Sequence, residues 1–416
     1  MKRVVITGMG TVNPIGNSLG EYWQSLREGR SGAGPITRFD ASAFATTYAA
    51  EVKDFDPQVR IDKREARKMD RFAQYSVYAA REAFEDAGLL DTTGVYDPER
   101  LGVILGVGIG GFETIEDSIG ILLSKGPGRV PPMTIPKMIA NIGPAQVAIN
   151  LNAQGPVYSL ATACASATDA IGNAMRHIRE GMIDVAVAGG VEAPITQLGI
   201  SGFNVIQALS TRWAADPTKA SRPFDKDRDG FLMGEGAGIL ILESLDHALA
   251  RGARIYAEVA GNAMTDDANH LTAPHPEGTG AARAITLALK DAGLKPEDID
   301  YVNAHGTSTP INDPVETMAI KKAFGEHAYK VAVSSTKSMT GHCVGAAGGV
   351  EAIAAAMAIY EGFIPPTINL DEPGEGCDLD YVPNTGRAVP VRAAISNSLG
   401  FGGHNGVVVL RSWTGA

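Results

Sequence analysis

The chain has 416 residues and a formal net charge of −11, with 44% hydrophobic and 20% charged residues. This profile is typical of a globular protein long enough for two domains or one large α/β unit, and its negative charge excludes a protein that binds nucleic acid or a membrane with its whole surface. Three widely separated cysteines offer neither a disulfide framework nor metal-ligand spacing, which favours a reducing cytoplasm.

The N-terminal residues are basic and then apolar, but the apolar run is too short for a signal peptide and is followed at once by Gly8 and Gly10. It predicts a first strand over residues 4–7. We expect no stretch of the chain to approach the length that spans a bilayer.

Predicted strands and helices alternate along the rest of the chain, which indicates an α/β fold with largely parallel sheets. The remaining strands are expected at residues 101–105, 157–160, 185–188, 239–243, 257–260, 301–304, 331–334, 393–396 and 407–410. The helices are expected at residues 18–28, 70–87, 113–123, 136–150, 164–180, 245–251, 278–292, 314–324 and 346–361.

Cys164 lies where a short strand turns into a helix. After it, the apolar positions follow helical spacing up to Ile178, and Gly181 ends the helix. The free N–H groups and the dipole of a helix N-terminus favour a thiolate, so we expect a lowered pKa and a nucleophilic sulfur. The alternative is an inert buried cysteine.

A weak internal repeat indicates that the fold is duplicated. Two helices rich in small residues end at Gly181 and Gly362, and counting back equally from each places Cys164 opposite Gly345. Two such halves, residues 1–250 and 251–416, would bring both strand-to-helix turns to one central site.

A glycine-rich loop at residues 106–111 follows a strand and precedes a helix, like a dinucleotide-binding loop. Its spacing is G-x-G-x-G-G rather than G-x-G-x-x-G, and no acidic residue is placed for a ribose. A tight turn beside a substrate channel is the better interpretation.

His305 and His342 follow strands in the second half, and open α/β sheets bind ligands at the carboxyl ends of strands. A thiolate with two imidazoles can attack a thioester, donate to an enolate oxygen and move a proton. A metal site is the alternative, although it would need a fourth ligand. Lys337 argues mildly against a cation there, and as a buried lysine it needs a carboxylate, for which Glu351 is the candidate.

The C-terminal loop at residues 397–405 joins two strands and is rich in glycine. A backbone N–H in this loop could complete an oxyanion hole with the N–H of Cys164. A plain hairpin, for which Gly402 and Gly403 would suffice, is the alternative.

Four motifs in order resemble the β-ketoacyl-[acyl-carrier-protein] synthases, and they are T-A-C-A-S at 162–166, N-A-H-G-T-S-T-P at 303–310, K-S-M-T-G-H at 337–342 and G-F-G-G-H-N at 400–405. The resemblance is strongest to the elongating enzymes of fatty-acid synthesis. It implies the thiolase fold, a five-layered αβαβα arrangement of two duplicated halves. It also implies a decarboxylative Claisen condensation of acyl- and malonyl-carrier protein, without a cofactor beyond the phosphopantetheine that arrives on the carrier. A type II polyketide ketosynthase is the alternative; a thiolase or a non-catalytic chain-length subunit fits the motifs less well.

The resemblance also assigns roles to single residues. Cys164 would carry the acyl group, His305 and His342 would assist decarboxylation, Lys337 would organise the site and Phe401 would gate it. The substrate-binding residues would be Ile109 at the far end of the acyl pocket, Thr307 and Thr309 on the phosphopantetheine, and Phe203 and Gly402. No firm metal site is implied; a monovalent cation would lie near Asn303, Glu351, Ser396 and Asn397.

A basic cluster at residues 63–71 stands out in this acidic chain. The family resemblance makes Arg64, Arg67 and Lys68 candidates for docking the acidic carrier protein, whereas a solvated helix face is the alternative. Gln207 stands where the family has a further docking arginine. A homodimer is also expected from the resemblance, and neither nucleic acid nor a membrane is expected as a partner.

Overall fold

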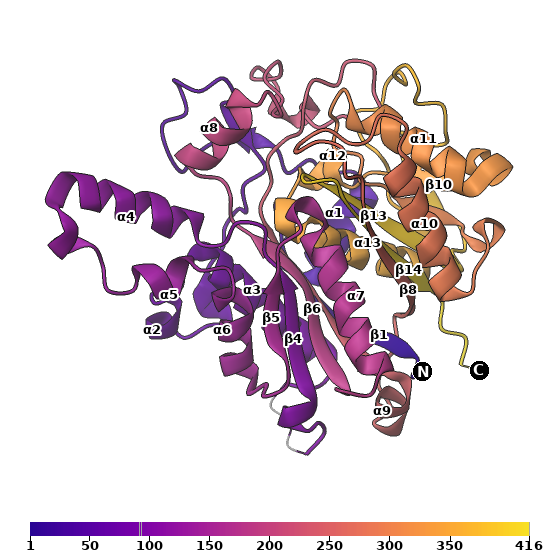
Figure 1. Ribbon diagram of the computed structural model, residues 1–416, viewed down its shortest axis with the longest axis horizontal. Coiled ribbons are helices and arrows are strands. Elements are labelled where there is room, and N and C mark those ends of the chain that lie inside the picture. Colours follow the sequence, from indigo (N-terminus) through magenta and orange to yellow (C-terminus); the bar gives the residue numbers. More distant parts are fainter. Residues whose placement is uncertain (91, 93, 416) are drawn as a thin grey trace.

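The computed structural model describes residues 1–90, Thr92 and 94–415. In this part of the chain, ten strands form one continuous sheet in the order β10-β9-β13-β14-β8-β1-β7-β6-β4-β5 (Figure 1). The first half supplies β1 (Val4–Val12), β4 (Leu101–Gly106), β5 (Val157–Leu160), β6 (Val185–Glu192) and β7 (Gly236–Ser244). The second half supplies β8 (Ala257–Asp266), β9 (Tyr301–Asn303), β10 (Ala332–Ser334), β13 (Ala393–Gly400) and β14 (His404–Arg411).

The two halves of the sheet have the same topology. In the first half β1 and β7 are antiparallel, as are β7 and β6, whereas β6, β4 and β5 are parallel. In the second half β8, β14, β13, β9 and β10 repeat this order and these directions. A short pairing of β1 with β8 joins the halves. The predicted duplication is therefore confirmed in the strand order, while the division at residue 250 stays a prediction.

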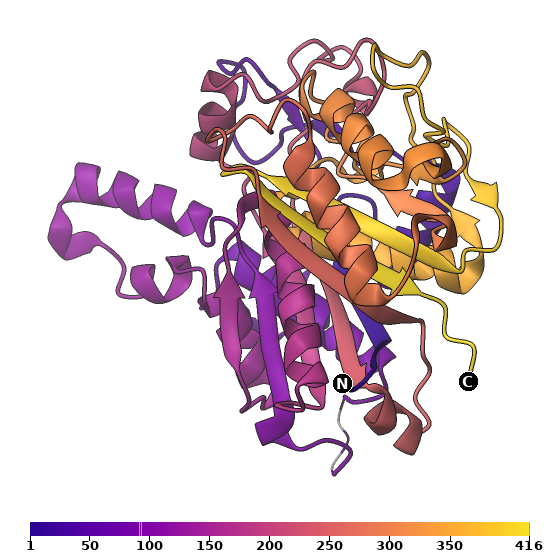
Figure 2. The same cartoon turned by 45° about the vertical axis from the view of Figure 1, so that its right-hand side comes forward.

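Helices complete five layers. On the outer face of the first half lie α3 (Arg71–Asp86) and α6 (Ile142–Leu151), and on that of the second lie α10 (Thr279–Ala292) and α11 (Asn312–Phe324). Between the halves lie α7 (Ser166–Arg179) and α13 (Ala347–Glu361), which share the central core (Figure 2). The αβαβα expectation is confirmed.

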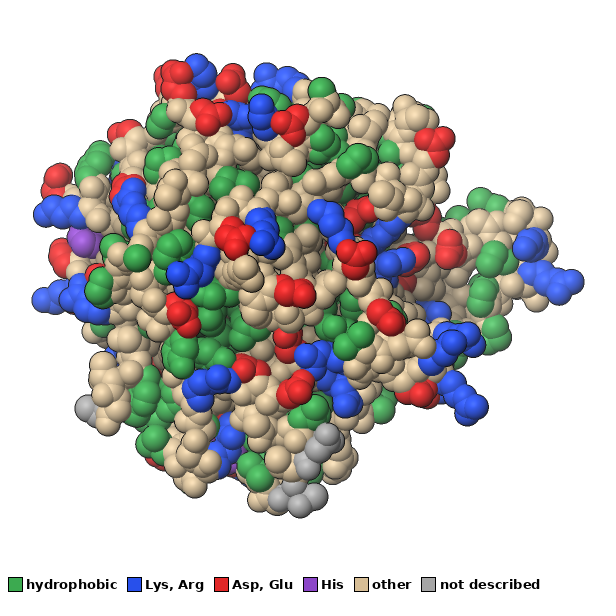
Figure 3. All heavy atoms as spheres, turned by 180° about the vertical axis from the view of Figure 1, so that it is seen from behind, with side chains coloured by type: hydrophobic (Ala, Val, Ile, Leu, Met, Phe, Trp, Pro, Cys, Tyr) green, Lys and Arg blue, Asp and Glu red, His purple; other side chains and the backbone are tan. Residues whose placement is uncertain are grey.

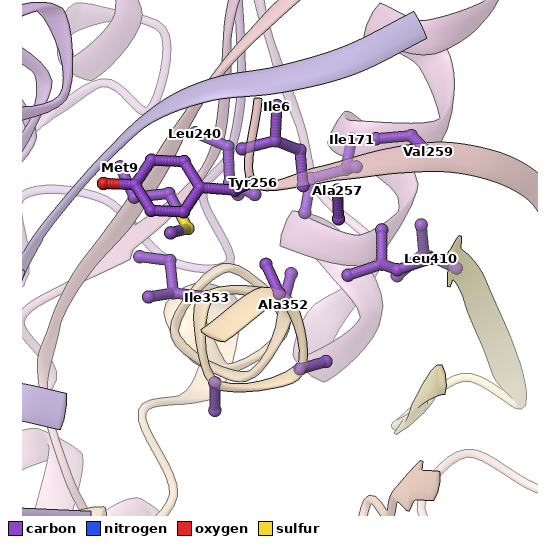
Figure 4. Packing of buried hydrophobic residues seen from close by; sticks show 14 of the residues in the cluster. Ile6, Met9, Ile171, Leu240, Tyr256, Ala257, Val259, Ala352, Ile353 and Leu410 are labelled. Atoms are coloured by element: carbon purple, nitrogen blue, oxygen red, sulfur yellow. The ribbon is translucent and has the colours of Figure 1, made fainter. Parts of the chain in front are cut away.

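The central helix α13 is apolar on every side because it is buried on every side. Figure 4 looks along it: Ala352 and Ile353 project toward Ile6, Leu240 and Leu410, which come from strands of both halves. Residues Val344–Glu361 are long and apolar enough to span a membrane by length and composition, so the expectation that no stretch approaches this length is wrong. This segment is 89% buried inside the fold, as expected for a core helix.

Strand β1 is longer than predicted because its glycines do not end it. A Cβ atom on Gly8 would lie 2.2 Å from the carbonyl oxygen of Ala83, and one on Gly10 would lie 2.2 Å from that of Ala79. These glycines let α3 pack directly on the strand.

The helix predicted at residues 136–150 is interrupted. It consists of α5 (Thr134–Met138) and α6, separated by Ile139, whose backbone is extended. Pro144 lies in the first turn of α6, where its ring would clash with the carbonyl of Ala140 in a continuous helix.

The structure also contains three helices that the sequence did not predict: α2 (Lys63–Ala66), α8 (Gln197–Val205) and α12 (Lys337–Thr340). The remaining helices are α1 (Leu19–Glu28), α4 (Phe112–Lys125) and α9 (Leu245–Ala250). Two short ribbons pair β2 (Gly34–Pro35) with β3 (Tyr48–Ala49) and β11 (Phe363–Ile364) with β12 (Arg387–Ala388). Helices α4 and α5 project from the body as an arm (Figures 1 and 2).

Candidate active site

Cys164 lies in a tight turn between β5 and α7. The 3₁₀ turn η4 (Ala163–Ala165) begins at Ala163 with a φ of 49°, in the left-handed region that costs a non-glycine residue energy. The turn η8 (Val344–Ala346), before α13, begins in the same way at Val344 with a φ of 47°. Cys164 and Gly345 therefore occupy matching positions in two matching turns, as the repeat predicted.

The sulfur contacts an imidazole from the other half. His342 Nε2 lies 3.0 Å from Cys164 Sγ. The rings of His305 and His342 have centroids 5.3 Å apart and stand at 88° to each other. The structure thus brings together the three residues that the sequence singled out.

A buried carboxylate that the sequence analysis missed holds the His305 loop. Glu316, on α11, accepts the backbone N–H groups of His305 and Gly306, each at 2.7 Å. The side chain of Asn397 also donates to it at 3.3 Å. The available signal was a glutamate near the start of the helix that follows the histidine loop.

Lys337 is buried and forms an ion pair with Glu351, which confirms the predicted partner. It is the first residue of α12, and its carbonyl oxygen accepts the hydroxyl of Ser221 at 2.6 Å. Its ammonium group is close enough to lower the pKa of Cys164, His305 and His342.

The prediction of a lowered cysteine pKa is wrong. Burial raises the pKa of Cys164 to about 12, because removing the thiolate from water outweighs the ammonium group of Lys337 and the N–H of Phe401. Burial also lowers the pKa of His305 and His342 well below the ordinary value, and Lys337 adds to this. At neutral pH the site therefore holds a thiol and two neutral imidazoles.

Phe401 lies at the tip of the hairpin between β13 and β14, followed by Gly402 and Gly403 with φ of 90° and 88°. Its backbone hydrogen-bonds to Cys164. The loop is therefore a hairpin, and it also places a main-chain donor beside the nucleophile, near where an oxyanion would form.

A cavity of about 340 Å³ opens onto the sulfur. The predicted site residues that line it are Cys164, Phe203, His305, Thr307, Thr309, His342 and Phe401. One wall is aromatic: the ring of Phe203 has its centroid 6.2 Å from that of Phe401 and 5.3 Å from that of Phe231. This lining suits a narrow, mostly apolar substrate.

Three of the predicted catalytic and substrate-binding residues lie outside this lining. Lys337 is buried behind it, and Gly402 donates its N–H to the carbonyl of Leu271 at 2.7 Å. Ile109 is half-buried in the loop after β4, where the carboxylate of Glu192 accepts the N–H groups of Gly108, Ile109 and Gly110. These donors are already engaged by the chain's own carboxylate, which argues against a dinucleotide phosphate there.

The four side chains expected near a monovalent cation each have a buried oxygen without a hydrogen-bond partner among the described residues: Asn303 Oδ1, Glu351 Oε2, Ser396 Oγ and Asn397 Oδ1. Asn303 and Ser396 are paired across β9 and β13, and α13, which carries Glu351, packs on both strands. Buried unpaired oxygens need a partner such as water or an ion, so the residues fit a hard cation. No group of three His, Cys, Asp or Glu side chains that could hold a metal ion occurs in the described part of the chain.

The docking candidates Arg64, Arg67 and Lys68 are exposed on and just after α2. Lys68 forms an ion pair with Glu65 at 2.8 Å. Arg71, the last member of the basic cluster, is held by Glu113 at 3.2 Å.

Comparison with known proteins shows the family of the chain. The model of the β-ketoacyl synthase N-terminal domain matches residues 1–248, and that of the β-ketoacyl synthase C-terminal domain matches residues 256–371. Two proteins named 3-oxoacyl-[acyl-carrier-protein] synthase 2 are similar. The one from Synechocystis sp. is 56% identical over 99% of this chain and 98% of its own length, and the one from Coxiella burnetii is 51% identical over 98% of each.

A solved structure of the ketosynthase AntDE with AntF, described as a type II PKS acyl-carrier protein in complex with its ketosynthase bound to the hexaketide, has a TM-score of 0.92. It is 36% identical and covers 99% of this chain and 100% of its own. The chain belongs to the β-ketoacyl synthase family, a family of condensing enzymes.

The depressed histidine pKa values predict a pH-dependent stability. The pKa of each histidine is lower in the folded than in the unfolded protein, where it is near 6.5. Below pH 6.5 the unfolded state therefore binds protons that the folded state does not, and the free energy of unfolding decreases as the pH falls. Between pH 6.5 and 5, the free energy of unfolding of wild type should therefore decrease, relative to that of H305N/H342N, by up to about 1.4 kcal/mol per pH unit for each histidine. Denaturant unfolding across this range measures the difference. An equal slope in the double variant would contradict the neutral imidazoles.

Proposed function

We propose that the chain is a β-ketoacyl-carrier-protein synthase of the synthase II type. It condenses acyl-carrier protein with malonyl-carrier protein to give 3-oxoacyl-carrier protein, CO₂ and free carrier protein in fatty-acid elongation. The single observation that carries this proposal is the 3.0 Å contact of Cys164 Sγ with His342 Nε2, beside a second neutral imidazole at the end of an apolar cavity. The similarity to the two synthase 2 proteins supports the substrate class.

In the first half-reaction the sulfur of Cys164 attacks the thioester carbonyl of the acyl-carrier protein. Neutral His342 accepts the thiol proton at Nε2, so that no free thiolate is needed despite the raised pKa of Cys164. The backbone N–H groups of Cys164 and Phe401 stabilise the tetrahedral oxyanion. The carrier thiolate leaves and takes the proton, and the acyl group stays on Cys164.

In the second half-reaction malonyl-carrier protein enters the same cavity. The imidazole of His305 donates to its thioester oxygen, and so does that of His342 once exchange with water has placed its ring proton on Nε2, so that the bond to the carboxylate breaks, CO₂ leaves and an enolate forms. The enolate carbon attacks the acyl carbonyl, the bond from that carbon to the sulfur of Cys164 breaks, and the thiolate takes a proton from water. Neutral imidazoles suit this role because they hydrogen-bond to the enolate without neutralising it by full proton transfer.

A type II polyketide ketosynthase is the second candidate, because the AntDE ketosynthase shares the fold over nearly the whole chain. The higher identity to the synthase 2 proteins favours fatty-acid elongation. We propose that no resident cofactor takes part, and that the enzyme works in the cytoplasm, where its three free cysteines stay reduced.

Cys164→Ala tests the mechanism directly. Intact-protein mass spectrometry should show one acyl group on wild type after incubation with acyl-carrier protein and none on the variant. The variant should still release CO₂ from malonyl-carrier protein, because both imidazoles remain. An unmodified wild-type protein would exclude the acyl-enzyme route.

We propose that the acidic carrier protein docks on Arg64, Arg67 and Lys68, which are exposed while the whole chain is acidic. The triple charge reversal R64E/R67E/K68E should raise KM for the carrier protein about tenfold or more, with little change in kcat. The matched triple K290E/K322E/K330E reverses exposed lysines of the second half and should leave KM unchanged. Equal effects of both triples would indicate an effect of net charge alone.

We propose a homodimer in which two copies meet at β5. This strand ends the sheet and is half-buried along its whole length. The neighbouring arm exposes Ile119, Leu123 and Ile135, and Figure 3 shows apolar side chains on the projecting arm, at the right of that view. An unpaired edge beside exposed apolar residues favours pairing with a second copy. Sedimentation equilibrium should give twice the chain mass of 43.5 kDa, and a monomer at micromolar concentration would contradict the proposal.

We propose that Asn303, Glu351, Ser396 and Asn397 hold a monovalent cation. Potassium or sodium chloride should then stabilise the protein against heat more than choline chloride of equal ionic strength, by roughly 1–3 kcal/mol. Ser396→Ala should remove most of this difference. Ser118→Ala, which changes a buried serine on α4 in the projecting arm, should keep it. An equal response to all three salts in wild type would exclude the cation.

A further inference from the structure

Glu192 is a buried carboxylate that the proposed reaction does not use. It ends β6 and is completely buried. Its two oxygens accept backbone N–H groups of Gly108 at 2.8 Å, Ile109 at 3.1 Å, and Gly110 and Gly345 at 3.2 Å. No other acceptor for these four N–H groups occurs among the described residues.

These four donors come from both halves of the fold. Residues 108–110 follow β4 in the first half, and Gly345 is the centre of the second-half turn that matches the Cys164 turn. Val344, beside Gly345, lines the cavity at Cys164. Glu192 therefore ties the loop that carries Ile109 to a wall of the substrate cavity.

The loop at residues 108–110 and the second-half turn both lie so close to the Glu192 carboxylate that each needs a glycine there. A Cβ atom on Gly108 would lie 2.6 Å from Glu192 Oε2, and one on Gly345 would lie 2.5 Å from it. The glycine-rich loop, whose sequence is like that of a dinucleotide-binding loop, instead surrounds this carboxylate.

We propose that Glu192 is a positioning residue that holds the loop at residues 108–110 against the second-half turn and thereby sets the acyl-chain length accepted at Ile109. This inference rests on the proposed condensing function. A carboxylate has enough lone pairs for all four donors, whereas an amide turns its own N–H₂ group toward some of them. Glu192→Gln keeps the volume of the side chain but leaves backbone N–H groups unpaired, so the loop should recede and admit longer chains.

The chain offers a matched control. Glu82, on α3, is also a buried carboxylate and accepts the backbone N–H groups of Thr11 and Leu19, each at 2.8 Å. It does not line the cavity. Glu82→Gln therefore makes the same chemical change and removes the same kind of hydrogen bond, but away from the acyl pocket.

The test measures kcat and KM with malonyl-carrier protein and acyl-carrier proteins from octanoyl to hexadecanoyl, using the full chain. In Glu192→Gln the ratio of kcat/KM for hexadecanoyl to that for decanoyl should rise about fivefold or more, whereas Glu82→Gln should change it less than about twofold. Ile109→Phe, which the family resemblance predicts to lower the ratio, shows whether the assay responds to this loop. An unchanged ratio in folded Glu192→Gln, or an equal change in Glu82→Gln, would overturn the proposal.

Hydrogen exchange provides a second measurement that does not depend on activity. The amides of residues 108–110 and of Gly345 should be protected together in wild type and lose protection together in Glu192→Gln, or in Glu192→Asp if the first variant does not fold. Unprotected amides in wild type would overturn the proposal by themselves. If wild type does not condense the substrates, the proposed function fails, and the exchange result still decides whether Glu192 anchors the loop.

Discussion

The site depends on one contact across the duplicated fold, between the sulfur of Cys164 and the imidazole of His342. Each residue reaches this point from its own half, so the distance is set by how closely the two central helices pack. Small residues make the approach possible. A Cβ atom on Gly348 would lie 2.1 Å from Thr168 Oγ1, and one on Gly190 would lie 2.5 Å from the carbonyl oxygen of Gly345. A side chain at Gly348 would push α13 away from α7, and one at Gly190 would push the second-half turn away from β6, so either would disturb the contact of Cys164 with His342.

Burial decides the charges in the site. The thiol and both imidazoles are uncharged at neutral pH, because a low-dielectric interior penalises the ionised forms. The ammonium group of Lys337 is tolerated because Glu351 lies against it. In the proposed reaction, charge would appear mainly in the transition states, beside the backbone N–H groups of Cys164 and Phe401.

Buried carboxylates hold the loops around the site by accepting the backbone N–H groups of those loops. Glu316 accepts the N–H groups of the His305 loop, Glu192 those of the Ile109 loop, and Asp313 those of Ser308 and Phe224. In each case a loop without regular hydrogen bonds is fixed by one side chain from a neighbouring element. Positioning in this enzyme is therefore carried largely by residues that never face the substrate.

The sequence alone determined the alternation of strands and helices and the duplicated order. It also picked out Cys164, His305, His342 and the Lys337–Glu351 pair as candidate site residues. These features could be predicted because hydrophobic periodicity and short motifs are local properties of the chain. The tertiary structure decided the rest. Gly8 and Gly10 continue β1 only because α3 packs on them, the pKa of Cys164 is raised because the fold takes much of it out of water, and Glu192 gains its partners from distant segments. No local pattern encodes these features, since each depends on which surfaces meet when the two halves close on each other.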